Sequence, residues 1–137
     1  MKGDINPAMT NEEKQLLFKD LCARLPYGVK INIYDDYSGT MKDEELNIFH
    51  LDSTYNIEYR KLQPYLRPMS SMTEEEKTEL SNFASVGMIS SQNNNPVFQL
   101  AIKALYGDFF NKRHIDYRGL IPMGLALEAP DGMYKTY

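Results

Sequence analysis

The chain has 137 residues, 42% of them hydrophobic and 25% charged, which is enough for one globular domain with its own core. Its net charge of -4 at pH 7 argues against a dedicated nucleic-acid binder, because such proteins normally present a basic face to phosphates. No window has the apolar length of a membrane span or signal peptide, and the single cysteine, Cys22, cannot form an intramolecular disulfide. We therefore expect a cytoplasmic protein.

The N-terminal part predicts a helix that follows a flexible leader at residues 1–9. Thr10 and Glu13 have capping-box spacing, in which each side chain accepts from a backbone amide of the first helical turn. Leu17, Leu21 and Leu25 then recur on one face, which is typical of a helix packed on a core. Cys22 lies in this apolar pattern, so we expect it to be a buried structural thiol.

The next part, up to residue 63, predicts an antiparallel meander. Apolar and polar residues alternate from Val29 to Tyr34, as in a half-buried strand, and Asp35 to Gly39 supply turn residues. Further strands are expected at 45–51 and 55–62.

The second half predicts a stiff connector at 64–72 followed by helices. Thr73 and Glu76 repeat the capping-box spacing and open a helix to about Gly87, with an apolar stripe at Leu80, Phe83 and Ala84. Asn95 and Pro96 open a second helix. Its expected core face consists of Phe98, Ala101, Ile102, Leu105 and Phe109. Asp116 is expected to cap a short helix ending at Gly124, before a last strand near 125–127.

These elements predict one α+β domain over residues 10–137, organised as 10–63, 64–72 and 73–137. Its sheet would have three or four antiparallel strands, or curl into a small SH3-like barrel, and would pack with three main helices.

Three segments resemble a known protein family: KDLCARLPYGV at 19–29, PYLRPMSSMTEEEK at 64–77 and DYRGLIPMGLALEAP at 116–130. The family consists of small uncharacterised proteins of gut Bacteroides and their phages, without an established activity. The resemblance implies a cytoplasmic accessory protein carried by a phage, prophage or other mobile element, and it supplies no catalytic residue.

Positive charge gathers at residues 112–118 of this acidic chain, where Lys112, Arg113 and Arg118 lie close in sequence. They could bind a phosphate or carboxylate. Alternatively, Lys112 and Arg113 complement the C-terminus of the preceding helix, Asp116 is a helix cap and Arg118 pairs with a local carboxylate. We favour this second interpretation, because it needs no ligand.

Tyrosines are abundant in the predicted β region and at its exit. They can pair across strands and stabilise the sheet, or they can present rings to a partner. The leading hypothesis is a non-enzymatic binding protein, monomeric or homodimeric, that engages a host protein or sequesters a small anionic ligand. Its candidate contacts are Tyr34, Tyr37, Tyr59, Tyr65, Arg67, Arg113 and Arg118.

Two other functions remain open. A nucleic-acid module would stack bases on these tyrosines and use Arg67, Arg113 and Arg118 on the backbone. A small hydrolase or nuclease would use His114 and Asp116. The sequence has no metal-ligand spacing, so no metal or cofactor is expected.

Overall fold

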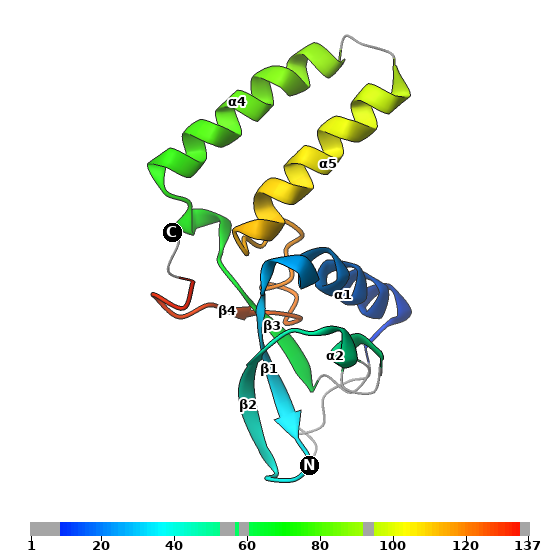
Figure 1. Cartoon of the computed structure of the whole chain (residues 1–137), viewed down its shortest axis with the longest axis vertical. Helices are drawn as coiled ribbons and strands as arrows, with labels where there is room; N and C mark the ends of the chain where they lie inside the picture. Colours follow the sequence, from blue (N-terminus) through cyan, green and yellow to red (C-terminus); the bar gives the residue numbers. More distant parts are fainter. Residues whose placement is uncertain (1–8, 53–56, 58–60, 92–94, 135–137) are drawn as a thin grey trace.

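The computed structural model describes residues 9–52, 57, 61–91 and 95–134, and for 83–91 it describes the backbone alone. A body of helix α1 (Asn11–Arg24) and a four-stranded sheet carries a hairpin of two long helices, which projects away from it (Figure 1). The two helices are α4 (Glu74–Ser91) and α5 (Pro96–Lys112). The α+β class with three main helices is therefore confirmed. Among the described residues, no helix combines the length and the hydropathy needed to cross a bilayer.

Helix α1 spans Asn11–Arg24 and begins with the expected capping box. The Glu13 amide donates to Thr10 Oγ1 (3.1 Å), and the Thr10 amide donates to Glu13 Oε1 (2.9 Å). Leu17 and Leu21 are buried against the sheet, as predicted. The prediction of a buried thiol is wrong: Cys22 is exposed, because successive residues of a helix lie about 100° apart and Cys22 falls outside the buried face.

The sheet has the order β2-β1-β3-β4 and is open. Strands β1 (Lys30–Asp35) and β2 (Thr40–Glu45) form an antiparallel hairpin, β3 (Leu62–Leu66) pairs antiparallel with the other side of β1, and β4 (Leu127–Glu128) pairs parallel with β3. Because β2 and β4 form two separate edges, the alternative of a closed SH3-like barrel is wrong. The expected meander is also corrected, since β3 lies beside β1 and not beside β2.

The strand predicted at 45–51 is wrong. Its first residue ends β2, and Ile48–Asp52 form a short helix, α2. The cause is local, because Asn47 Oδ1 accepts from the amides of Phe49 (2.9 Å) and His50 (3.3 Å), which competes with an extended backbone.

The strand predicted at 55–62 falls mostly outside the described residues, and the described strand starts where that prediction ends. Pro64, expected in a stiff connector, lies within β3 opposite Ile31. A proline has no amide hydrogen to donate to a neighbouring strand. It is tolerated at position 64 because β4, on the side of β3 away from β1, pairs with β3 only at Tyr65 and Leu66.

Helix α4 spans Glu74–Ser91, four residues beyond the predicted end, and α5 spans Pro96–Lys112. The second capping box is confirmed: the Glu76 amide donates to Thr73 Oγ1 (3.1 Å), and the Thr73 amide donates to Glu76 Oε1 (2.8 Å). Asn95 Oδ1 caps α5 by accepting from the Val97 amide (2.9 Å). Two side chains of the apolar stripe predicted for α4, those of residues 83 and 84, lie outside the part of the chain whose side chains are described.

The helix predicted after Asp116 is absent, because residues 120–124 form turns. The Asp116 carboxylate nevertheless acts as a cap, accepting from the amides of Leu120 (2.8 Å) and Ile121 (2.9 Å). The Leu125 amide then donates to the Leu120 carbonyl, which closes the turn before β4.

Candidate interaction surfaces

Arg67, at the end of β3, forms a buried ion pair with Glu76 in the first turn of α4. Its Nη1 and Nη2 donate to the two carboxylate oxygens at 2.9 and 2.7 Å. Its other donors reach Ser71 Oγ, the Ser71 carbonyl and the Arg113 carbonyl. A guanidinium has five N–H donors, and all five of Arg67 are used, so this residue holds the hairpin to the body and has no donor left for a ligand.

Arg113, at the end of α5, extends this cluster toward solvent. Its Nη1 donates to the Phe109 carbonyl (3.1 Å), as expected for a cation at a helix C-terminus. Its Nη2 lies 2.7 Å from Glu79 Oε2, and its Nε lies 3.7 Å from Glu76. The hydrogen bonds from Arg67, with the Thr73 amide and the charge of Arg113 as further causes, lower the pKa of Glu76 despite its burial. The carboxylate is therefore held ionised.

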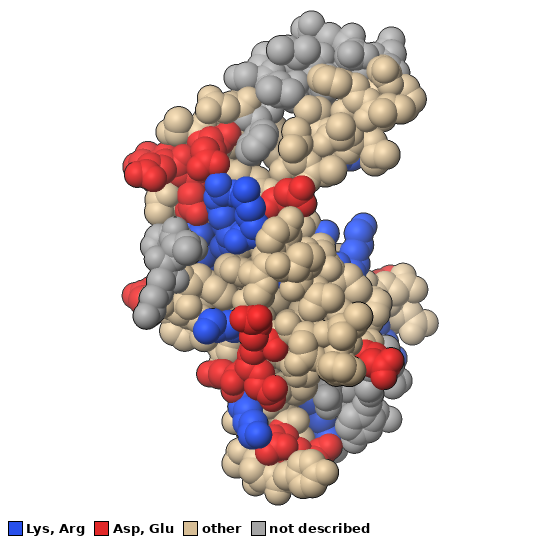
Figure 2. Space-filling model, in the orientation of Figure 1, with Lys and Arg blue, Asp and Glu red and all other residues tan. Residues whose placement is uncertain are grey.

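A pocket of about 600 Å³ opens beside this cluster. It is lined by Arg67, Thr73, Glu74, Glu75, Glu76, Glu79, Lys112 and Arg113. Figure 2 shows blue and red atoms in contact there, at the base of the hairpin. Because Arg67 is saturated, Arg113 is held by Glu76 and Glu79, and four glutamates stand against three basic side chains in the lining, the pocket attracts an anion little.

A second buried cluster joins α1 to the segment after α5. Asp20, completely buried, accepts from Arg24 Nε (2.9 Å) and from Arg118 Nη1 (2.7 Å). Arg24 Nη2 also donates to the Ile115 carbonyl (2.7 Å). Arg118 is therefore paired, as the cap-and-dipole interpretation requires, although its carboxylate partner is 98 residues away and not local.

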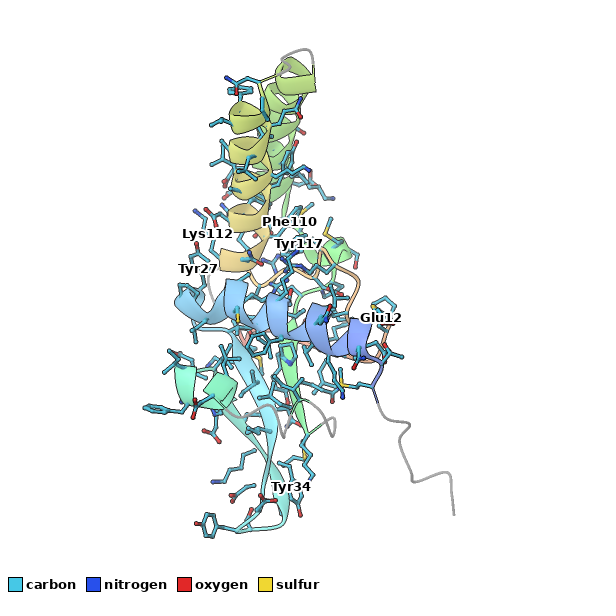
Figure 3. All side chains as sticks on the ribbon, turned by 90° about the vertical axis from the view of Figure 1, so that its right-hand side faces the viewer. Glu12, Tyr27, Tyr34, Phe110, Lys112 and Tyr117 are labelled. Atoms are coloured by element: carbon cyan, nitrogen blue, oxygen red, sulfur yellow. The ribbon has the colours of Figure 1, made fainter. Side chains whose placement is uncertain are left out.

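Of the described candidate tyrosines, Tyr34 and Tyr37 lie away from these arginines, in the β1–β2 hairpin. Tyr34 and Tyr65 lie on the sheet face away from the buried Ile31 and Ile33. Figure 3 shows Tyr34 far from Lys112, near the tip of the β1–β2 hairpin. Of the other two tyrosines, Tyr37 is fully exposed in the turn of that hairpin and Tyr59 lies outside the described residues.

On that face, Tyr65 is part of a hydrogen-bonded cluster. Its hydroxyl donates to Asp43 Oδ1 (2.7 Å), which also accepts from Asn32 Nδ2 (3.0 Å). These bonds, from Asn32 first and then Tyr65, lower the pKa of Asp43. The cluster links β3, β1 and β2 through side-chain hydrogen bonds, which differ from the pairing of tyrosine rings weighed from the sequence.

His114 and Asp116 have structural roles in the turn that follows α5. His114 has a φ of 60°, is buried, and stacks on Tyr134 with 3.9 Å between ring centroids. Burial lowers its pKa to about 4, and the charges of Arg24 and Arg67 add to this effect. The Asp116 carboxylate is occupied by two backbone amides. Among the described residues, no group of three or more His, Cys, Asp or Glu side chains is placed to hold a metal ion.

Helix α5 presents an apolar stripe that the sequence analysis missed. Val97 is 73% exposed, Leu100 68% and Leu105 45%, and the Ala101 and Ala104 side chains between them are also exposed. Of the predicted core face, Ile102 and Phe109 are buried and Phe98 is half-buried, whereas Ala101 and Leu105 are exposed. The sequence held a signal, because Lys103 is the only charged residue between Pro96 and Gly107, so α5 is apolar on more than one side.

The stripe lies well around the helix from the face that packs on α4. Five residues separate Val97 from the buried Ile102, which is about 140° at 3.6 residues per turn. At the base of the hairpin, Asp108 continues the direction of Val97 and Ala104, and its Oδ1 lies 3.4 Å from the Tyr27 hydroxyl. In Figure 2 the described part of the projecting hairpin carries few charged atoms above its base. This uncharged stripe is the strongest candidate interaction surface among the described residues.

Comparisons of the chain with protein-family models, curated proteins and solved structures give no match.

Proposed function

We propose that this protein is a non-enzymatic binding module that engages another polypeptide through the exposed stripe of α5, formed by Val97, Leu100, Ala101, Ala104 and Leu105. The observation that carries the proposal is the exposure of three large apolar side chains on a projecting helix. Apolar residues at three- and four-residue spacing are how helices dock with other helices.

The other binding hypotheses have less support. A small anionic ligand would need arginine donors, but Arg67 is saturated and Arg118 is paired with Asp20. A nucleic acid would need the same arginines, and the stripe is uncharged. An accessory role in a phage or mobile element rests on the resemblance of the three segments described above, and fits a protein that acts by binding.

Site-specific photocrosslinking tests the proposal. Leu100 is replaced with the photoreactive residue p-benzoylphenylalanine, and cells that naturally carry the gene are irradiated. We expect a discrete polypeptide adduct, because position 100 would face the partner. The matched control places the same residue at Lys103, which is exposed on another side of α5.

An adduct from position 100 and none from position 103 would support the proposed surface. No discrete adduct from position 100, with the protein intact and folded, would overturn it.

A further inference from the structure

We propose that the polypeptide bound by the α5 stripe is a second copy of this chain, packed antiparallel to form a symmetric dimer. This inference rests on the proposed function and names its partner. It is drawn from the order of large and small residues along the stripe.

Four of the five stripe residues form a palindrome, whereas the position symmetric to Val97 is Asp108. Residues 100–105 read Leu-Ala-Ile-Lys-Ala-Leu, and their exposed apolar members, Leu100, Ala101, Ala104 and Leu105, read the same from either end. Ile102 is buried, and Lys103 lies outside the stripe by helical spacing.

A two-fold axis requires a surface that is complementary to itself. With the axis between positions 102 and 103, Ala101 of one copy lies at the level of Ala104 of the other, and Leu100 lies at the level of Leu105. Small residues thus meet at the centre, where they allow the two backbones to approach, and leucines flank them on both sides. An unrelated partner would give no reason for this symmetry.

At the base of the hairpin the body limits the arrangement, because the Tyr27 hydroxyl lies 3.4 Å from Asp108 Oδ1 on the stripe's side of α5. The hairpin projects from the body, so antiparallel stacking of two hairpins leaves the two bodies at opposite ends (Figure 1). At about 100° per residue, the stripe residues lie about 60° to 160° around α5 from the buried Ile102, with Leu105 nearest to it, so the α5 helices of two copies can pack against each other.

The size of the surface sets the expected strength. A 17-residue helix is about 26 Å long and about 10 Å wide, so α5, which carries the whole stripe, offers a flat face of about 260 Å² per copy. Stable interfaces usually bury about 800 Å² of accessible surface per partner, and a ridged helical face exceeds its flat area. We therefore expect a reversible dimer whose population rises with protein concentration.

Sedimentation velocity over a concentration series, on the full chain, measures this directly. The wild type should shift from monomer toward twice the monomer mass as the concentration rises. Two double variants, L100K/L105K and L100E/L105E, should each remain monomeric because they place like charges across the axis. An equimolar mixture of the two should recover the dimer, because opposite charges then meet. Gln99→Lys, a new lysine at an exposed position off the stripe, is the matched control and should dimerise like the wild type.

Circular dichroism establishes that each variant is folded, which the exposure of both leucines favours. A wild type that stays monomeric at every concentration would overturn the dimer, and so would charge variants that dimerise separately as well as the wild type does. Crosslinking separates this inference from the proposed function. A monomer whose position 100 crosslinks to a different chain would overturn the dimer alone, whereas a monomer with no adduct would overturn both.

Discussion

The body and the helical hairpin bury their residues very differently. In α1, Leu17, Asp20, Leu21 and Arg24 are all buried within 14 residues. In α5, Ile102 alone is buried before Phe109, although most of that stretch is apolar. Helix α1 therefore buries one side in the core of the body, whereas α5 leaves an apolar stripe exposed. The body also exposes large apolar side chains, among them Ile48 and Phe49 on α2. Such surface adds stability only when something covers it, which supports the proposal that the hairpin makes the contact.

The largest expected effect comes from the ion pair that joins the two regions. Arg67→Met leaves Glu76 buried without its main partner, and breaking a buried pair costs about 3–5 kcal/mol. Urea unfolding should show this loss in the free energy of unfolding.

Two controls accompany this variant. R67M/E76M should recover much of the loss, because removing both charges leaves none unpaired. Arg113→Met, which breaks a partly exposed pair with Glu79, should cost less than about 1 kcal/mol. If Arg67→Met were as mild as Arg113→Met, the pair would not hold the two regions together.

A matched pair of leucine truncations tests the comparison itself. Leu66→Ala opens a cavity in the body and should cost about 2–5 kcal/mol. Leu100→Ala removes an exposed side chain and should change the stability of the monomer by less than about 0.5 kcal/mol. Both are measured by urea unfolding at low protein concentration. Similar costs for the two variants would mean that Leu100 is packed within the monomer.

A smaller effect is expected from His114, which lies where the hairpin meets the body. Its pKa falls from 6.5 to about 4 on folding, so between these pH values the unfolded chain binds more protons than the folded one. The free energy of unfolding should therefore fall as the pH is lowered from 6.5 toward 4.

His114→Asn provides the control, because asparagine tolerates the positive φ and does not titrate. Its stability should depend less on pH over this window. An unchanged pH dependence would assign the effect to other groups.

The sequence predicted the features that are encoded locally. Both capping boxes and the Asn95-Pro96 helix start depend on residues within three positions of each other, and all three are present. The alternating pattern from Val29 to Tyr34 also matches a strand. The short run at 45–51 was predicted as a strand, but the hydrogen bonds of the Asn47 side chain favour a helix there.

The candidate site could not be predicted in the same way. Arg118 pairs with Asp20, which is 98 positions away in the sequence. The spacing of apolar and polar residues along a chain does not predict a contact over that separation. The Arg67–Glu76 pair spans only nine residues, yet the sequence alone does not distinguish a saturated arginine from an exposed one. The sequence shows that α5 is apolar on more than one side, but only the fold shows which of these sides is buried and which forms the exposed stripe.

Hydrogen–deuterium exchange of α5, at low and high protein concentration, tests most directly whether the hairpin is an interaction arm on a self-sufficient body. We predict that amides of residues 97–107 exchange more slowly at high concentration, while those of β1 and α1 exchange equally at both. Exchange of α5 that is independent of concentration would contradict the account, because it would mean that no second copy covers the stripe.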